Sequence, residues 1–210
     1  MTAIAVIAKA PAPGRSKTRL TPPCTPEQAA ALATAALADT LAAVAATPCT
    51  RRVVVLDGAP AAWLPPGFDV IAQRGDGLAD RLAAAFADIG EPLLVVGMDT
   101  PQLTPGMLAH ALGGLAQADA VLGAACDGGY WAIGLRAADD AVFAGVPMSD
   151  PATCAVQRAR LGELGLITCE LGVLRDVDDI DDARAVAAQA PDTRFARALA
   201  ALGPAEVCAV

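Results

Sequence analysis

The chain has 210 residues, enough to bury roughly 70% of the surface that its unfolded form exposes, and 55% of its residues are hydrophobic. Its net charge of -8 at pH 7 repels nucleic acid and anionic membrane surfaces, so we expect neither as a partner. Six scattered cysteines and a single histidine argue against a zinc site and indicate a reducing compartment. We therefore expect a cytoplasmic protein in which residues 1–210 form one domain, without signal peptide or membrane span.

A basic loop follows the first predicted strand, residues 2–8. Two prolines and a glycine exclude regular structure in it. It holds four cations although the chain is acidic overall, and both lysines of the chain lie here. Such cations after a buried strand favour phosphate binding, although a solvated charged loop is the alternative. The residues that we assign to phosphate binding are Lys9, Gly14, Arg15, Lys17 and Arg19.

Two common phosphate-binding motifs do not fit this loop. The P-loop pattern requires glycines at the positions of Pro11 and Ser16, and its helix would have to start where Pro22 and Pro23 stand. The dinucleotide fingerprint GxGxxG does not follow the first strand. The loop is therefore neither a P-loop nor a Rossmann dinucleotide turn.

Helices and apolar strands alternate in the next part of the chain. A capping box at residues 25–28 predicts a long helix to about residue 46. Between the third strand and the helix after it, Gln73 and Gly75 lie in a glycine-rich loop that either wraps a nucleobase or only makes a tight turn. The elements predicted here are strands at 51–56, 68–72 and 93–97 and a helix at 78–89.

The strand at 93–97 ends in a carboxylate. Its unbroken apolar run is typical of a parallel strand that helices cover on both faces, and Asp99 comes directly after it. Ligands bind at this carboxyl edge of an open α/β sheet, which makes Asp99 a candidate site residue. The alternative is an aspartate that only caps the loop before the helix at 105–115.

The second half of the chain contains a candidate acceptor pocket. Asp-Gly-Gly between the apolar runs 120–125 and 132–135 predicts a hairpin, which by itself accounts for the glycines. The functional interpretation is that a carboxylate and an aromatic ring line a pocket together with the loop that precedes a helix ending near residue 165. The residues assigned to this pocket are Asp127, Gly128, Gly129, Tyr130 and Ser149.

Five carboxylates fall within residues 176–182. Those at 179–182 begin a helix at 180–189, where acids favour the positive end of the dipole. Asp176 and Asp178 share one side of an extended segment. A hard divalent cation held by Asp99 requires a second carboxylate, so we predict Mg²⁺ or Mn²⁺ on Asp99 and Asp178, with Asp176 as the alternative to Asp178.

Together these elements, with a closing helix at 192–202, predict an α/β fold with a mainly parallel Rossmann-like sheet. Strands 2–8 and 93–97 should be neighbours in it, with helices on both faces. The sequence shows no internal repeat and does not indicate an oligomeric state.

Four blocks resemble the bacterial DUF2064 family: KAPxPGRxKTRL from Lys9, GxDxP from Gly97, DGGY from Asp127 with IGL from Ile133, and RDVD from Arg175. This resemblance implies a three-layer α/β/α GT-A fold of the nucleotide-diphospho-sugar transferase type. The family is commonly labelled as glycosyltransferases, one branch with arsenosugar biosynthesis, and is similar to guanylyl- and cytidylyltransferases. Met98, Thr100 and Met148 depart from residues frequent in the family.

Three functions are compatible with these residues. A glycosyltransferase with a nucleotide-sugar donor follows from the family resemblance, whereas four cations suit the triphosphate of a nucleotidyltransferase better. A regulator that binds nucleotide without turnover is the third. For either enzyme, the partners are the nucleotide donor and a small-molecule acceptor, and the residues assigned to catalysis are Lys17, Asp99 and Asp127.

Overall fold

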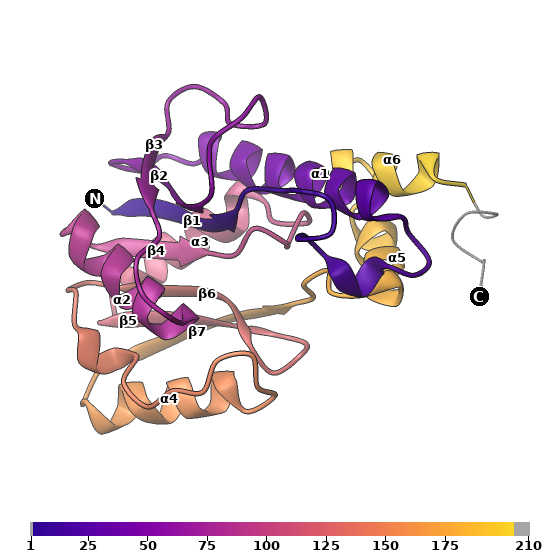
Figure 1. Ribbon diagram of the computed structural model, residues 1–210. Helices are drawn as coiled ribbons and strands as arrows, with labels where there is room; N and C mark the ends of the chain where they lie inside the picture. Colours follow the sequence, from indigo (N-terminus) through magenta and orange to yellow (C-terminus); the bar gives the residue numbers. More distant parts are fainter. Residues whose placement is uncertain (1, 204–210) are drawn as a thin grey trace.

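A computed structural model describes residues 2–203 of the protein as three layers, with helices on both faces of a seven-stranded sheet (Figure 1). The strand order is β3-β2-β1-β4-β6-β5-β7. The strands are β1 (Ala3–Lys9), β2 (Arg52–Asp57), β3 (Asp69–Ala72), β4 (Leu93–Val96), β5 (Ala120–Ala125), β6 (Tyr130–Leu135) and β7 (Thr168–Leu174).

The sheet is mainly parallel, as the sequence predicts. β1 pairs in parallel with both β2 and β4, so the predicted adjacency of the first strand and the strand before Asp99 is confirmed. β6 runs antiparallel to both β4 and β5. The hairpin formed by β5 and β6 turns at residues 126–129, where the Asp-Gly-Gly pattern predicts it. The chain reversal places the hairpin turn near the carboxyl end of β4.

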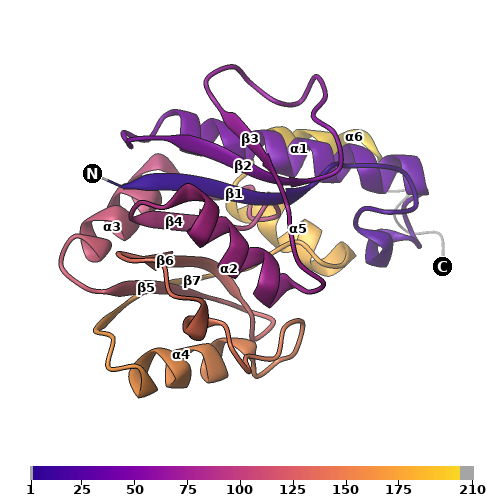
Figure 2. The ribbon, with the colours of Figure 1, turned by 60° about the vertical axis from the view of Figure 1, so that its left-hand side comes forward.

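Two helices cover each face of the sheet. Apolar side chains of α1 and α3 pack on one face, and those of α2, α4 and a short 3₁₀ turn on the other. Figure 2 shows α4, in orange, beyond β5 and β7 at the opposite end from β3. The helices are α1 (Pro26–Ala45), α2 (Leu78–Ile89), α3 (Pro105–Leu115), α4 (Thr153–Glu163), α5 (Ile180–Gln189) and α6 (Arg194–Ala201), with 3₁₀ turns at Thr18–Leu20 and Asp140–Val142.

Helix α1 is long and apolar enough, by length and composition, to cross a membrane. In the fold, 56% of its apolar window is buried, because one side packs on the sheet and another meets α5 and α6. Its N-terminus has the predicted capping box, in which Gln28 N donates to Thr25 Oγ1 at 3.2 Å and Thr25 N to Gln28 Oε1 at 2.7 Å. Burial within the protein therefore accounts for the apolar character of this helix.

The last strand, β7, begins at Thr168, ahead of the extended segment that carries Asp176 and Asp178. It is an edge strand in which only Leu171 and Leu174 are buried, and Val173 is 62% exposed. Its weak apolar pattern explains why the sequence did not indicate its full length. The cysteines of the described residues are free thiols, and Cys208 lies outside that part of the chain.

A third apolar cluster joins two segments that are far apart in the sequence. Leu20, at the end of the basic loop, is fully buried with Val177, which stands between Asp176 and Asp178. Residues of α1, α5 and α6 complete this cluster, and Figure 1 shows α5 and α6, in yellow, beside α1. The cluster holds the basic loop against the acidic segment after β7.

We expect Leu20→Ala to lower the free energy of unfolding by about 2 to 5 kcal/mol, because it removes a fully buried side chain from this cluster. Urea titration followed by circular dichroism measures the loss. Ile167→Ala is the control, since Ile167 is 68% exposed and its truncation should change stability by less than about 0.5 kcal/mol. Equal effects of the two substitutions would contradict the proposed anchoring role of Leu20.

Candidate active site

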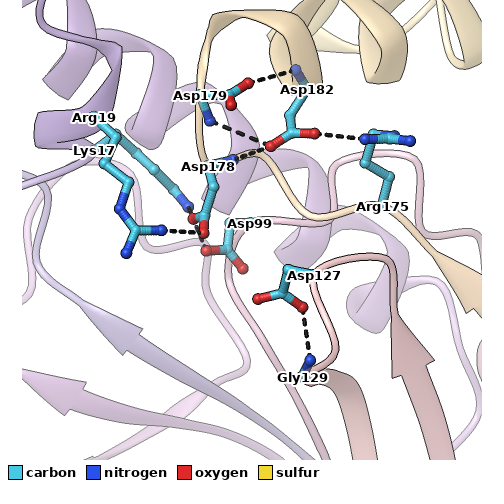
Figure 3. A network of polar contacts seen from close by, with 9 residues as sticks. All are labelled: Lys17, Arg19, Asp99, Asp127, Gly129, Arg175, Asp178, Asp179 and Asp182. Carbon is cyan, nitrogen blue, oxygen red and sulfur yellow. Dashed lines mark hydrogen bonds and ion pairs between the residues drawn. The ribbon is translucent and has the colours of Figure 1, made fainter. Parts of the chain in front are cut away.

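The basic loop and the predicted metal ligands meet beyond the carboxyl ends of β1 and β4. Lys17 Nζ lies 2.5 Å from Asp99 Oδ2 and 3.2 Å from Asp178 Oδ1. Arg19 Nη1 lies 2.8 Å from Asp178 Oδ2. Figure 3 shows these side chains converging from the N-terminal loop, the turn after β4 and the segment before α5. Three separate parts of the sequence therefore form one charged centre.

Lys17 is the internal counter-ion of this centre. Its side chain is only 12% exposed, and its backbone is in the left-handed region with φ 47°. Burial disfavours the charged ammonium, but the carboxylates of Asp99 and Asp178 outweigh this effect and raise the pKa of Lys17. The ammonium therefore stays charged and holds two carboxylates together that would otherwise repel each other.

Backbone hydrogen bonds fix the two acidic segments to each other. Val177 N donates to the carbonyl of Asp99 at 3.0 Å, and Gln102 Nε2 donates to the carbonyl of Arg175 at 2.5 Å. Arg175 in turn forms an ion pair with Asp182 at 2.7 Å. The carboxylates after β4 and β7 are thus held in place by main-chain contacts and not only by their own charges.

A second group of carboxylates lies beside the first. One oxygen each of Asp127, Asp176 and Asp178 lies within 4.8 Å of the others. Burial, reinforced by the carboxylates of Asp99, Asp127 and Asp178, raises the pKa of Asp176 to about 6. Such a group of oxygen ligands suits Mg²⁺ or Mn²⁺, so the residues present fit the predicted cation.

The hairpin turn gives Asp127 a defined orientation. Gly129 N donates to Asp127 Oδ1 at 2.8 Å (Figure 3). Gly128 has φ 92°, and a Cβ at this position would lie 2.0 Å from the carbonyl oxygen of Pro151. The turn therefore packs directly against the loop before α4, and both glycines serve the local backbone structure. Only the carboxylate of Asp127 offers chemistry to a ligand here.

A cavity of about 540 Å³ opens next to this turn, within the size range of small-molecule sites. Asp99, Asp127, Asp176 and Asp178 line it, and Tyr130 and Ser149 of the predicted acceptor pocket line it as well. Burial raises the pKa of Tyr130, and its hydroxyl donates to Gln157 Oε1 at 3.4 Å. The structure thus gathers the predicted acceptor residues around the carboxylates.

In the predicted base-binding loop, the Gln73 side chain forms hydrogen bonds within the protein. Gln73 Nε2 donates to the carbonyls of Ala8 and Val55 at 2.7 and 3.0 Å, and Gln73 Oε1 accepts from Arg81 at 3.1 Å. A Cβ on Gly75 would lie 2.4 Å from the Cβ of Asp80. The tight turn alone therefore explains Gly75. Base binding by Gln73 and Gly75 stays a prediction. Gln73 lines a cavity of about 260 Å³ together with Lys9 and Asp99, and Asp99 also lines the 540 Å³ cavity.

The remaining cations of the loop lie around a smaller cavity. Lys9, Arg15, Lys17 and Arg19 all line a space of about 230 Å³. Lys9 is largely solvated, with its ammonium 3.8 Å from Asp57. Gly14 has φ 70° and serves the turn of the loop, and it is absent from the residues that line this cavity. The cations that we assigned to phosphates therefore share one compartment.

Sequence reasoning underestimated two acidic residues. Asp176 is only the alternative ligand in the sequence analysis, yet burial and three neighbouring carboxylates raise its pKa. Asp150 was not considered, although it lines the 540 Å³ cavity. Its position before Pro151 resembles an ordinary helix start, since its Oδ1 accepts from Ala152 N at 2.7 Å. No local pattern could show that this loop folds towards the carboxylates.

The fold is the GT-A-like α/β fold of nucleotide-diphospho-sugar transferases. The chain belongs to the DUF2064 family, described as "Uncharacterized protein conserved in bacteria", whose model matches residues 34–150. None of the curated proteins matches the sequence. The structure is similar to a provisionally named nucleotide-diphospho-sugar transferase from Desulfovibrio desulfuricans G20, with 26% identity, TM-score 0.86 and coverage of 98% of this chain and 96% of the other.

Two more distant structures share the fold. Rv0371c from Mycobacterium tuberculosis H37Rv, crystallised in complex with manganese, has 22% identity and TM-score 0.56, with 88% of this chain and 96% of the other covered. A 4-diphosphocytidyl-2C-methyl-D-erythritol synthase from Anaerococcus prevotii DSM 20548 has 10% identity and TM-score 0.54, with 95% of each chain covered. The fold is therefore one that sugar transferases and nucleotidyl-transferring enzymes have in common.

We expect Lys17→Met to bind Mn²⁺ more tightly than the wild type when no nucleotide is present. The substitution removes a positive charge that lies 2.5 Å from one carboxylate and 3.2 Å from another. Near a protein surface such a charge is worth roughly 1 to 4 kcal/mol, so the affinity should rise by about tenfold. The metal-free variant should also melt at a lower temperature, because Asp99 and Asp178 then repel each other.

Calorimetric titration with Mn²⁺ and thermal unfolding with and without it check both effects. Lys9→Met is the matched control. The Lys9 side chain is 47% exposed, and its ammonium makes one long contact, 3.8 Å, with Asp57, which is not a predicted metal ligand. Unchanged Mn²⁺ affinity in Lys17→Met would show that Lys17 does not compete with the cation.

Proposed function

We propose that the protein is a metal-dependent glycosyltransferase that uses a nucleotide-sugar donor, acting in the cytoplasm as one domain of residues 1–210. The observation that carries this proposal is the meeting of four carboxylates with the basic loop at one edge of the sheet. Nucleotides bind at this edge in open α/β sheets, and a divalent metal ion there is usually held by one or two carboxylates together with the substrate phosphates.

In this proposal the cationic side chains bind the donor phosphates, and the carboxylates bind the metal ion. Lys9, Arg15 and Arg19 neutralise phosphate oxygens of the donor from the smaller cavity. Asp99 and Asp178, together with Asp176, would hold Mg²⁺ or Mn²⁺, which leaves Asp127 for the acceptor. When bound, this ion supplies positive charge beside the leaving diphosphate. With that ion bound, Lys17 would be free to contact the donor phosphates, because the ion would replace its charge at Asp99 and Asp178.

Asp127 is suited to act on the acceptor. Its Oδ1 accepts a hydrogen bond from Gly129 N, and its carboxylate faces the 540 Å³ cavity. A carboxylate in this position orients an acceptor hydroxyl and takes up its proton as the new bond forms. The reaction needs no side-chain nucleophile.

Nucleotidyl transfer is the second candidate, because four cations in the loop suit a triphosphate. Glycosyl transfer is preferred on the similarity to a provisionally named nucleotide-diphospho-sugar transferase at 26% identity. Regulation by nucleotide binding without turnover is the third possibility.

A direct comparison of donors distinguishes these candidates. The purified protein is incubated with Mg²⁺ or Mn²⁺ and panels of nucleotide sugars and nucleoside triphosphates, with water as a poor acceptor. We expect tighter binding of a nucleotide sugar than of its triphosphate and slow release of free sugar and nucleoside diphosphate, because the activated donor is already positioned. Preference for the triphosphate and release of pyrophosphate with a sugar phosphate would favour nucleotidyl transfer. Binding without turnover would favour the regulator.

Asp178→Asn should reduce metal-dependent nucleotide affinity by about tenfold or more, because it removes a charged ligand shared by Lys17, Arg19 and the acidic group. Asp181→Asn is the matched control, three residues further on and 85% exposed at its side chain. Calorimetry with nucleotide, in the presence and absence of Mg²⁺, measures both variants. An equal Mg²⁺ effect in wild type and Asp178→Asn would remove Asp178 from the metal site.

A further inference from the structure

Two cavities of opposite charge adjoin at the ion pair of Arg19 and Asp178. The smaller is lined by four cations and by Asp178. The larger, of about 540 Å³, is lined by five carboxylates and by a single cation, Arg19. The carboxylates come from four separate segments and are Asp99, Asp127, Asp150, Asp176 and Asp178.

Neighbouring arginines do not offset this negative charge. Arg158 pairs with Glu170 at 2.6 Å, and Arg175 pairs with Asp182 at 2.7 Å. Neither belongs to the residues that line the larger cavity. With one divalent cation bound, five carboxylates would still face only four positive charges: two from the ion, one from Arg19 and one from Lys17, whose ammonium lies 2.5 Å from Asp99.

The rest of the wall is uncharged. Tyr130, Trp131 and Met148 contribute aromatic and thioether surface, and Ser149 and Thr153 belong to the loop and helix start at the rim. Such a wall suits the carbon face of a small polyol, with carboxylates to accept hydrogen bonds from hydroxyl or ammonium groups. Arg19 is the only cationic side chain that lines it.

We propose that the acceptor is a neutral or cationic small molecule with a hydroxyl or amine nucleophile and no phosphate or carboxylate group. This inference rests on the proposed function and specifies its second substrate. The donor phosphates occupy the cationic cavity, and the acidic cavity rejects anionic acceptors by like-charge repulsion.

The transfer step is balanced for such an acceptor. The acceptor oxygen or nitrogen forms a bond to the anomeric carbon of the donor sugar. The bond between that carbon and the phosphate oxygen breaks, and its electron pair leaves with the nucleoside diphosphate. The proton of the nucleophile passes to the carboxylate of Asp127. A phosphorylated acceptor, in contrast, would bring two further negative charges into a cavity that is already acidic.

The test uses three ligands with one carbon skeleton: glucose, glucosamine and glucose 6-phosphate. Ligand-observed NMR measures their binding to the full chain with Mg²⁺ and the nucleoside diphosphate that binds best. We expect glucose or glucosamine to bind at least about tenfold more tightly than glucose 6-phosphate. When the nucleotide sugar replaces the diphosphate, glucose or glucosamine should accelerate cleavage of the nucleotide sugar more than glucose 6-phosphate does.

A charge-reversal variant tests the physical cause. Asp150→Lys should reduce the discrimination against glucose 6-phosphate by about fivefold or more, since Asp150 lines the acidic cavity. Asp139→Lys is the matched control, because Asp139 Oδ1 accepts from Ala141 N at 2.9 Å just as Asp150 Oδ1 accepts from Ala152 N at 2.7 Å, but Asp139 lies outside the cavity lining.

Each outcome has a distinct meaning. If nucleotide and Mg²⁺ do not bind, the proposed function fails. If they bind but glucose 6-phosphate is preferred, or if none of the three ligands binds, only the assignment of the acceptor is overturned. Equal discrimination in wild type and Asp150→Lys would overturn the electrostatic explanation and with it the inference.

Discussion

The repulsion between carboxylates at the edge of the sheet is the constraint on which the site depends. Asp127, Asp176 and Asp178 lie close together near Asp99, and burial, reinforced by the neighbouring carboxylates, raises the pKa of Asp176 to about 6. In the structure, Lys17 relieves this repulsion with an ammonium between Asp99 and Asp178. In the proposed mechanism a divalent metal ion would take the place of this ammonium, so the charges that need neutralisation would also form the cation site.

The scaffold keeps these charges close without relying on their own interactions. The backbone bond from Val177 to Asp99 joins the segments after β7 and β4, and Leu20 packs with Val177 below the basic loop. Apolar burial and main-chain hydrogen bonds hardly change with ionic strength, unlike surface ion pairs. Charged groups can thus be placed where they are unfavourable for stability but useful for binding phosphate and metal.

The cationic and the acidic side chains of the site line two different cavities. Cations from the loop after β1 line one cavity, and carboxylates from later segments line the other. The ion pair of Arg19 and Asp178 lies at their boundary. In the reaction proposed above, a donor with its phosphates on the cationic side would present its sugar to the acidic side, in keeping with the acceptor inferred above.

The sequence alone determined the parallel core of the fold, because unbroken apolar strands followed by capped helices leave few arrangements, and it located the basic loop and the carboxylates after Val96 and Leu174 from their positions at strand ends. It missed the full length of β7, since an edge strand lacks an unbroken apolar pattern. Only the tertiary structure showed that Lys17 pairs with Asp99 and Asp178, that Gln73 is held by three protein hydrogen bonds, and that Asp150 enters the acidic cavity. These contacts join residues far apart along the chain, and long-range distances of this kind depend on how loops pack, which local periodicity and capping do not specify.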